Sequence, residues 1–508
     1  MLLGCAPAPQ RVVPRCPASE KVQQRNDGFE ARVDGARLSF VFHASRWSNL
    51  LYQLDCLARL MPCSTEAYAA LWQKDLGGLD SEDRAALERW RQIRQRYQGR
   101  IEAGTDSEDP LLPLPLSANS VETHIRLAQR AAGGLERYRA YAALFMEPRD
   151  VEASAQVIER FAERHSRAYA AQRAPLEERA QALAERFRRA KLGAFIERAA
   201  RFYDSELPPH TELEFELLFR PEHDSASYGQ NRGRVSFVEL VPQENLDARL
   251  AVVMHELFHF LFATAKRDQA VRLANVFAND DDPLAYPAWG LLDESLAAAL
   301  GNGMVLEKLD AGELERRLGR PDGLYSDDLI DAVARELLTK MPVLLDTPGG
   351  LYADSTRESY LAAVRTAFPH GLPPRAYLRP WVCLYDPSFV DAYDALARAV
   401  HAPVTVSDSS VVPRRTNIIL EQRARWSRVL MLRRADLQHL EGYEGAVGAE
   451  TVRQVRQRAK QPGAFVVARA SAPQAFVFVA DTAPEMKRLV ADFAKLSELR
   501  AGVVLGGT

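Results

Sequence analysis

The sequence has few cysteines, no long apolar run and no excess of charge of either sign. Five cysteines among 508 residues are too few for a disulfide-rich framework, and none of them form a CxxC metal-binding pair. No apolar run reaches the roughly 18 residues that a membrane-spanning helix needs. The 65 Lys and Arg residues nearly balance the 68 Asp and Glu residues, so we expect no nucleic-acid partner and no attraction to anionic membranes through bulk charge.

Two of the cysteines, Cys56 and Cys63, are seven positions apart in a segment with a helical pattern. On one helix their Cα atoms would lie about 10 Å apart, beyond the reach of a disulfide unless Pro62 bends the chain. We therefore interpret both side chains as buried apolar residues.

The first residues, Met1-Leu2-Leu3-Gly4-Cys5, resemble the lipobox at which bacterial lipoproteins are cut and lipidated. The basic and most of the apolar part of a signal peptide are missing ahead of Cys5. If the true start lies upstream, the resemblance implies a cell-envelope lipoprotein anchored at Cys5. Otherwise the match is accidental and we expect a cytoplasmic protein.

The chain is long enough for about three domains, and its 47% hydrophobic and 26% charged residues are typical of globular proteins. We predict an α+β protein that is predominantly helical. Its expected parts are an N-terminal tail, a helical region, a domain with a small mixed sheet and a small α/β domain, at residues 1–28, 29–204, 205–401 and 416–508.

The division into these parts rests on the spacing of apolar residues along the sequence. Apolar residues recur every three or four positions in three segments of the helical region, whereas the Pro-rich residues 104–117 indicate a linker. The pattern then changes to the two-residue repeat of strands, separated by a turn-like segment at 223–233. The helical segments are Val121–Phe145, Val151–Ala171 and Leu176–Tyr203, and the strands are Thr211–Phe219 and Val235–Val241.

Beyond these strands, a helix is expected to begin near Asn245 and helical patterning resumes from Pro287 to Val400. In the α/β domain the segments 429–432, 464–468 and 476–479 are typical of strands. A capping box of Thr482 and Glu485 predicts a closing helix.

The helix after Asn245 contains His255-Glu256-Leu257-Phe258-His259, an H-E-x-x-H motif. Four-residue spacing places both imidazoles on one helix face, where they can bind one cation. The neighbouring carboxylate of Glu256 can then take a proton from a water molecule on the metal. The plain alternative is a core helix whose histidines form local hydrogen bonds.

A catalytic zinc ion normally has three protein ligands, so the motif needs one more. No histidine follows His259 at the spacing of metzincins. The best candidate is Glu294, which lies in an apolar helical segment 35 residues after His259 and can reach the site if the chain reverses. Its neighbour Asp293 is a weaker candidate and is also suited to a helix start.

This combination resembles the gluzincins, the thermolysin-like metallopeptidases. The resemblance covers about residues 205–400 and implies that His255, His259 and Glu294 bind Zn²⁺, with Glu256 as the general base. It also implies a zincin-like core in which Val235–Val241 would be the strand beside the substrate cleft.

The chain departs from that family at Ala298, where thermolysin-like enzymes have an Asp that orients a ligand histidine. Asp293 or Asn302 would have to replace it. The G-x-M-x-N signature of gluzincin aminopeptidases is also absent. For the donor that stabilises the oxyanion we predict Tyr360, with Tyr352, Arg357 and His370 as alternatives.

The predicted function is thus a zinc-dependent hydrolase of peptide bonds in a peptide or protein substrate, with cobalt and manganese as alternative metals. A catalytically silent, envelope-associated binding protein with a zincin-like fold is the second hypothesis, although the intact Glu256 argues against it. A purely structural helical scaffold, which would bind no metal, is the third.

Overall fold

The structure is a computed structural model of the 508-residue chain. It describes residues 28–60, 63–102, 134–144, 146–222, 228–232, 234–282, 284–379, 381–400, 405–424, 426–469, 471 and 473–506. Cys5 and the rest of the predicted tail up to residue 27, as well as the predicted linker 104–117, lie outside these residues.

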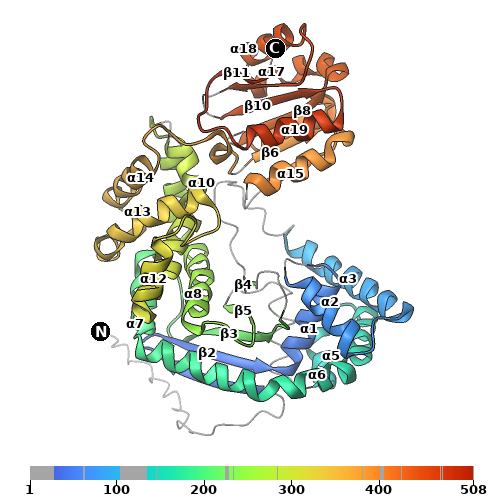
Figure 1. Ribbon diagram of the computed structural model, residues 1–508, viewed down its shortest axis with the longest axis vertical. Coiled ribbons are helices and arrows are strands. Elements are labelled where there is room, and N and C mark those ends of the chain that lie inside the picture. The colour runs from blue at the N-terminus through green and yellow to red at the C-terminus, as the bar shows by residue number, and fades with distance from the viewer. Residues whose placement is uncertain are drawn as a thin grey trace, which may run out of the picture.

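In the described part of the chain the strands form two sheets, which lie toward opposite ends of the long axis of the molecule (Figure 1). The first sheet contains β1 (Gly28–Asp34), β2 (Leu38–Ser45), β3 (Thr211–Phe219), β4 (Gly229–Arg232) and β5 (Val235–Leu240). The second contains β6 (Trp381–Tyr385), β7 (Thr405–Asp408), β8 (Ser427–Arg433), β9 (Phe465–Arg469), β10 (Ala475–Ala480) and β11 (Gly502–Leu505).

Helices make up most of the described chain. Together with the two sheets they confirm the predicted α+β class. Around the first sheet they are α1 (Arg46–Leu57), α2 (Thr65–Asp75), α3 (Ser81–Glu102), α5 (Leu135–Ala142), α6 (Pro148–Arg189), α7 (Leu192–Phe202) and α8 (Leu246–Ala263). Next come α9 (Arg267–Ala278), α10 (Ala285–Ala297), the π-helix η2 (Ala298–Val305), α11 (Leu306–Leu309), α12 (Ala311–Leu318), α13 (Asp328–Leu344), η3 (Gly350–Tyr352), α14 (Asp354–Ala367) and η4 (Pro374–Tyr377). The C-terminal part adds η5 (Pro387–Phe389), α15 (Val390–Val400), α16 (Pro413–Gln422), η6 (Arg434–Tyr443), α17 (Glu444–Val447), α18 (Ala449–Arg458) and α19 (Ala483–Phe493).

The first sheet is mixed, with the strand order β1-β2-β3-β5-β4. Strands β2, β3 and β5 are parallel, whereas β1 and β4 run antiparallel to their neighbours. One face packs on α6, where Phe42 lies 5.9 Å from Phe187 between ring centroids, and the other packs on α1 through Tyr52 and Phe237. With both faces covered, the polar residues of the inner strands are buried too, among them His43, Glu214 and Glu239.

Two predictions about this sheet are wrong. Residues 29–204 are not only helical, because β1 and β2 join the same sheet as β3; β2 is buried throughout, so it lacks the alternation that marks a half-exposed strand. The segment 223–233, predicted to be a turn, contains β4. This strand has only four residues, too few to produce a recognisable strand pattern in the sequence. The strand predicted at Thr211–Phe219 is confirmed.

Helix α6 differs from the prediction of two helices separated near residue 173. It runs through Pro175 as one 42-residue helix and ends at Arg189, where Lys191 takes a left-handed conformation before α7. The interior proline lacks one backbone donor. A buried stripe that includes Leu183 and Phe187 continues past it, and packing of that stripe offsets the loss.

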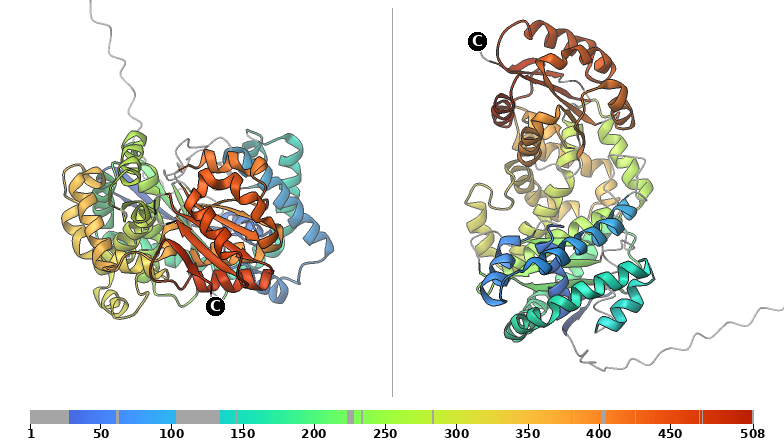
Figure 2. Two further views of the ribbon diagram at one scale, coloured as in Figure 1. Left: turned by 90° about the horizontal axis from the view of Figure 1, so that it is seen from above. Right: turned by 90° about the vertical axis from the view of Figure 1, so that its right-hand side faces the viewer.

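The second sheet has the order β11-β9-β10-β8-β6-β7 and lies apart from the first (Figure 2). Residues 381–400, predicted to complete the 205–401 domain, instead form β6 and α15 of this unit. Strand β6 pairs in parallel with β7 and β8, which follow it in the sequence, and this pairing places residues 381–400 in the C-terminal unit. The predicted capping box at Thr482 and Glu485 is confirmed at α19.

Cys56 and Cys63 form a disulfide, contrary to the expectation of two separate apolar thiols. Helix α1 ends at Leu57, and Arg59 adopts a positive φ of 55°, so Cys63 is not on the same helix and the Cα atoms are 5.9 Å apart. Both residues are nevertheless buried, as predicted.

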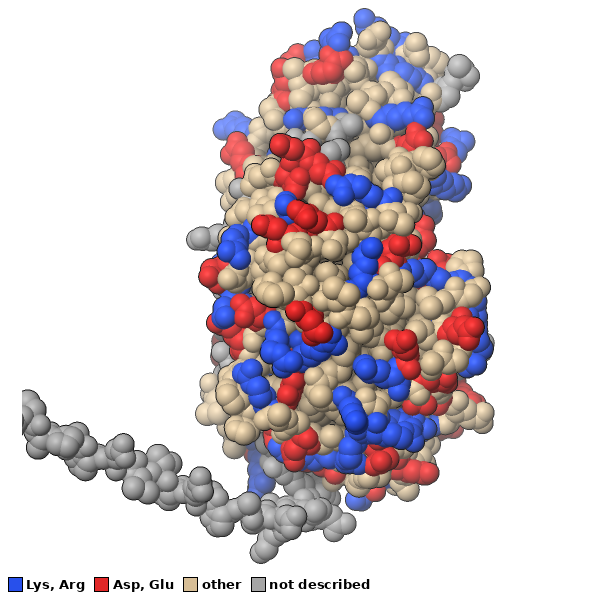
Figure 3. Space-filling model, turned by 90° about the vertical axis from the view of Figure 1, so that its left-hand side faces the viewer, with Lys and Arg blue, Asp and Glu red and all other residues tan. Residues whose placement is uncertain are grey.

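None of the helices in the described residues combines the length and the apolar character needed to cross a bilayer. The face drawn in Figure 3 carries acidic and basic side chains interspersed with one another, in keeping with the balanced composition.

Candidate metal centre

Helix α8 carries the H-E-x-x-H motif. The helix begins at Leu246, which confirms the predicted start near Asn245. Asn245 is its N-cap, and the Asn245 side chain accepts hydrogen bonds from the backbone N–H groups of Asp247 and Ala248. Buried apolar residues on α8 fix the helix against the core, among them Leu250, Val253, Leu257 and Phe258. His255 and His259 therefore emerge from a rigid element, one turn apart on the same face.

Glu294 lies on α10, which continues into the π-helix η2. Gly301 in η2 lies against the backbone of His255: a Cβ at this position would be 2.6 Å from the His255 Cα atom. Only glycine permits this approach without displacement of one helix. Since π-helical turns are frequent at functional sites, the close contact indicates that η2 helps to set the spacing between the histidines and Glu294.

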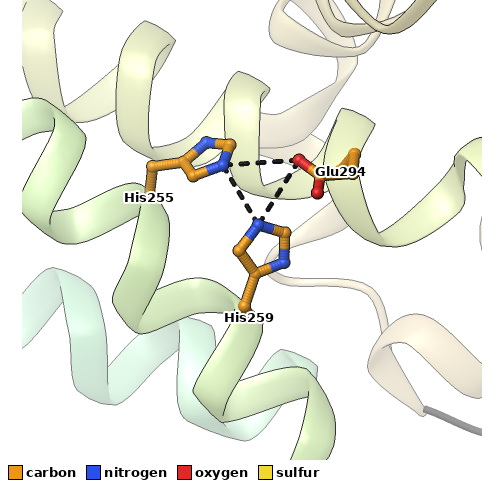
Figure 4. A group of neighbouring side chains, drawn as sticks. All are labelled: His255, His259 and Glu294. Carbon is orange, nitrogen blue, oxygen red and sulfur yellow. Dashed lines mark hydrogen bonds and ion pairs between the residues drawn. The ribbon is translucent and has the colours of Figure 1, made fainter. Parts of the chain in front are cut away.

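The three predicted ligands converge (Figure 4). The Nε2 atoms of His255 and His259 are 3.0 Å apart, and the Glu294 Oε2 atom is 3.5 Å from the first and 3.4 Å from the second. Ligands of a tetrahedral zinc ion, each about 2.0–2.1 Å from it, lie about 3.4 Å from one another. The donor set and its spacing thus fit a small divalent cation.

Asp293 supplies a carboxylate beside His259. The residue four positions after Glu294 is Ala298, which has no carboxylate to supply. Its Oδ1 atom is 3.0 Å from the Nδ1 atom of His259, so the other ring nitrogen is directed toward Glu294. Asn302, the other predicted candidate, instead donates to the backbone oxygen of Leu324. The carboxylate beside His259 therefore precedes Glu294 in the sequence rather than following it by four.

Electrostatics in the group favour a bound cation. Burial lowers the pKa of His259, but the negative charges of Asp293 and Glu294 outweigh it and hold that pKa well above its usual range. Burial raises the pKa of Glu294, yet the charges of His259 and His255, with their hydrogen bonds, hold it well below its usual range.

Glu256 faces the edge of the first sheet. Burial raises its pKa, against the charges of His255 and His259, which favours a carboxylate that can take up a proton. A Cβ on Gly229 of β4 would lie 3.6 Å from the Glu256 Cγ atom. The strand that faces Glu256 is thus the edge strand β4. The segment Val235–Val241, predicted to lie beside the substrate cleft, forms β5, which lies between β3 and β4.

The predicted donor Tyr360 is not brought to this group. Its side chain is 2% exposed, and its hydroxyl donates to the backbone oxygen of Ala288 at 2.6 Å, which makes it a packing residue of α14 against α10. Of the alternatives, Arg357 pairs with Asp280, Tyr352 lies near Asp204 and His370 is exposed.

Sequence reasoning missed Tyr325. Its ring stacks on His255 with centroids 5.5 Å apart, and its hydroxyl is hydrogen-bonded to Glu294. Burial, followed by the charge of Glu294, raises the pKa of Tyr325, so the hydroxyl stays protonated. The only local signal was its place two residues before Asp327, the N-cap of α13.

Comparison of the chain with known proteins gives no relative: no protein-family model, no curated protein and no solved structure matches it.

Proposed function

We propose that this protein is a zinc-dependent peptide-bond hydrolase of the gluzincin type. The observation that carries the proposal is the convergence of His255, His259 and Glu294 from two helices at spacings that fit one tetrahedral cation. Side-chain exposures of 18% for His259 and 26% for Glu294 support access from solvent, which a hydrolytic site needs.

Two imidazoles and one carboxylate suit Zn²⁺, with cobalt and manganese as alternatives. When bound, the ion would acidify a water molecule and polarise the carbonyl of a peptide bond. His255, His259 and Glu294 would hold it, and Asp293 would keep His259 in the tautomer that presents Nε2.

The remaining steps belong to residues of the chain. Glu256 would accept the proton of the attacking water and pass it to the leaving amine, a role that suits its raised pKa. Tyr325, whose hydroxyl remains protonated, would turn its one hydrogen bond from Glu294 to the oxyanion. The outer edge of β4, which is the last strand of this sheet in the described part of the chain, would pair with an extended substrate backbone next to Glu256.

The test is metal analysis of the purified protein combined with hydrolysis of casein. We expect about one zinc ion per chain, together with chelator-sensitive hydrolysis. Glu256→Gln should retain the zinc and reduce the rate by about 10²–10⁴-fold. The matched control is Glu307→Gln, an exposed glutamate on α11, which should leave both quantities unchanged.

Two results would contradict the proposal. A protein that binds zinc but hydrolyses no peptide, before and after Glu256→Gln, would support the silent binding protein instead. A protein that binds no divalent metal would support the structural scaffold.

A further inference from the structure

Glu239 of β5 is a fully buried carboxylate, 0% exposed, on the face of the first sheet that packs against α1. Its Oε1 atom accepts from the Tyr52 hydroxyl and the Ser64 backbone N–H, each at 3.1 Å. Its Oε2 atom accepts from the Ser64 hydroxyl at 2.5 Å and from the Tyr228 backbone N–H at 3.0 Å. A buried carboxylate with four donors is well satisfied and holds each donor in place.

Arg220 supplies the opposite charge in this network. Its side chain is 2% exposed, its Nε atom donates to the Ser64 hydroxyl at 2.7 Å, and the same atom lies 3.8 Å from the Glu239 Oε2 atom. The guanidinium, the hydroxyl and the carboxylate thus form one buried unit. Removing the charge of Glu239 would leave the buried guanidinium beside a neutral side chain.

The network reaches the candidate site through Tyr228, the residue before β4. Glu239 binds both sides of Tyr228: its carboxylate accepts the Tyr228 N–H, and its own backbone N–H donates to the Tyr228 carbonyl at 3.0 Å. The next residue is Gly229, which faces Glu256 across the sheet edge. The start of β4 is therefore fixed from one face of the sheet and meets the general base on the other.

We infer that Glu239 is a positioning residue that fixes the substrate-facing strand β4 relative to Glu256. The inference rests on the proposed function, in which β4 pairs with the substrate backbone. Glu239 touches neither the metal ligands nor the substrate, and acts through Tyr228 and Gly229.

The decisive variant is Glu239→Gln, which keeps the size of the side chain. Its amide offers one oxygen as an acceptor and turns an NH₂ group toward one of the two pairs of donors. We expect KM for casein to rise about tenfold, kcat to change by less than about twofold, and zinc content to stay unchanged, because only substrate binding depends on β4.

The matched control is Asp55→Asn, the same exchange in another buried network. Asp55 of α1 accepts from Trp90 at 2.8 Å and from Arg94 at 3.0 Å, and these two partners lie on α3. This control should lower stability without raising KM. An equal rise of KM in both variants would overturn the inference, since general loosening would then explain it.

Hydrogen exchange tests the same point without activity. Faster exchange of the β4 amides in Glu239→Gln, with α8 unchanged, would support the inference, and unchanged exchange in β4 would overturn it. If the wild-type protein holds no zinc and hydrolyses nothing, the proposed function fails. The exchange of β4 then still decides whether Glu239 positions the strand.

Discussion

Among the described residues, histidines lie beside groups of carboxylates in two regions. On the helices, His255 and His259 face Glu294. In the first sheet, His43 of β2 lies beside Glu214 and Glu216 of β3, and their ligand atoms also come within 4.8 Å of one another. The helical group is partly exposed, with 26% at Glu294, whereas the side chains of His43 and Glu214 are 5% and 8% exposed.

The two groups use the imidazole differently. Each nitrogen of His43 faces its own carboxylate, Glu30 on one side and Glu214 on the other, both at 3.8 Å. In the helical group Asp293 takes one nitrogen of His259, and the other converges with His255 and Glu294 on a common point. A cluster of histidines and carboxylates is thus a stronger candidate for a metal site when one ring nitrogen of a histidine is held by a carboxylate and the other ring nitrogen points to a place shared with other ligand atoms.

The largest expected effect separates the two groups directly. His259→Ala removes one of three ligands and should reduce zinc from about one ion per chain to a trace. His43→Ala should keep the zinc, because the strand group is not the proposed centre. Metal analysis of both variants checks this, and loss of zinc from His43→Ala alone would reverse the assignment.

Gly301→Ala should be the next most damaging change, with a cost of about 3 kcal/mol in the free energy of unfolding. The added Cβ would meet the His255 backbone at 2.6 Å, so η2 must move away from α8. Urea unfolding and zinc content measure the result. Gly312→Ala in α12 is the control, because the nearest atom to its Cβ would be 3.5 Å away; equal loss in both would contradict the role of the close contact.

Asp293→Asn should weaken zinc binding by about 10- to 100-fold, because the neutral amide no longer increases the basicity of His259. Competition with a zinc chelator measures the affinity. The exposed Asp281→Asn should leave it unchanged. An unaffected affinity in Asp293→Asn would show that the 3.0 Å contact with His259 does not act on the metal.

The smallest expected effect comes from a histidine without a carboxylate partner. Burial, with a smaller effect of Arg46, lowers the pKa of His165 on α6 to about 3, against an ordinary 6.5. The unfolded chain therefore takes up the proton first, and stability falls as the pH drops below 6.5. At pH 5 the loss is about 2 kcal/mol.

Urea unfolding at pH 7.5 and pH 5 tests the effect of His165. His165→Gln should remove this part of the pH dependence, because the unfolded chain then no longer takes up a proton at this position. A wild-type protein equally stable at both values of pH would contradict the prediction.

The sequence alone determined those features that depend on neighbours within one helix or one strand. The i, i+4 spacing of His255 and His259, the helix start near Asn245 and the alternation in Thr211–Phe219 follow from local patterns, and the structure contains all three. The convergence of Glu294 was expected from a lone carboxylate in an apolar helix, and the geometry agrees with it.

Tertiary structure decided the features that depend on pairing between distant segments. The sequence did not show that β2 joins β3 or that β4 rather than β5 forms the edge beside Glu256. Nor did it show that Tyr325, instead of Tyr360, lies at the group of His255, His259 and Glu294. A short buried strand has no distinctive period, and a tyrosine has the same local pattern whether it packs in the core or lines a site. Only the close packing of η2 against α8, which Gly301 permits, brings the parts of the site together.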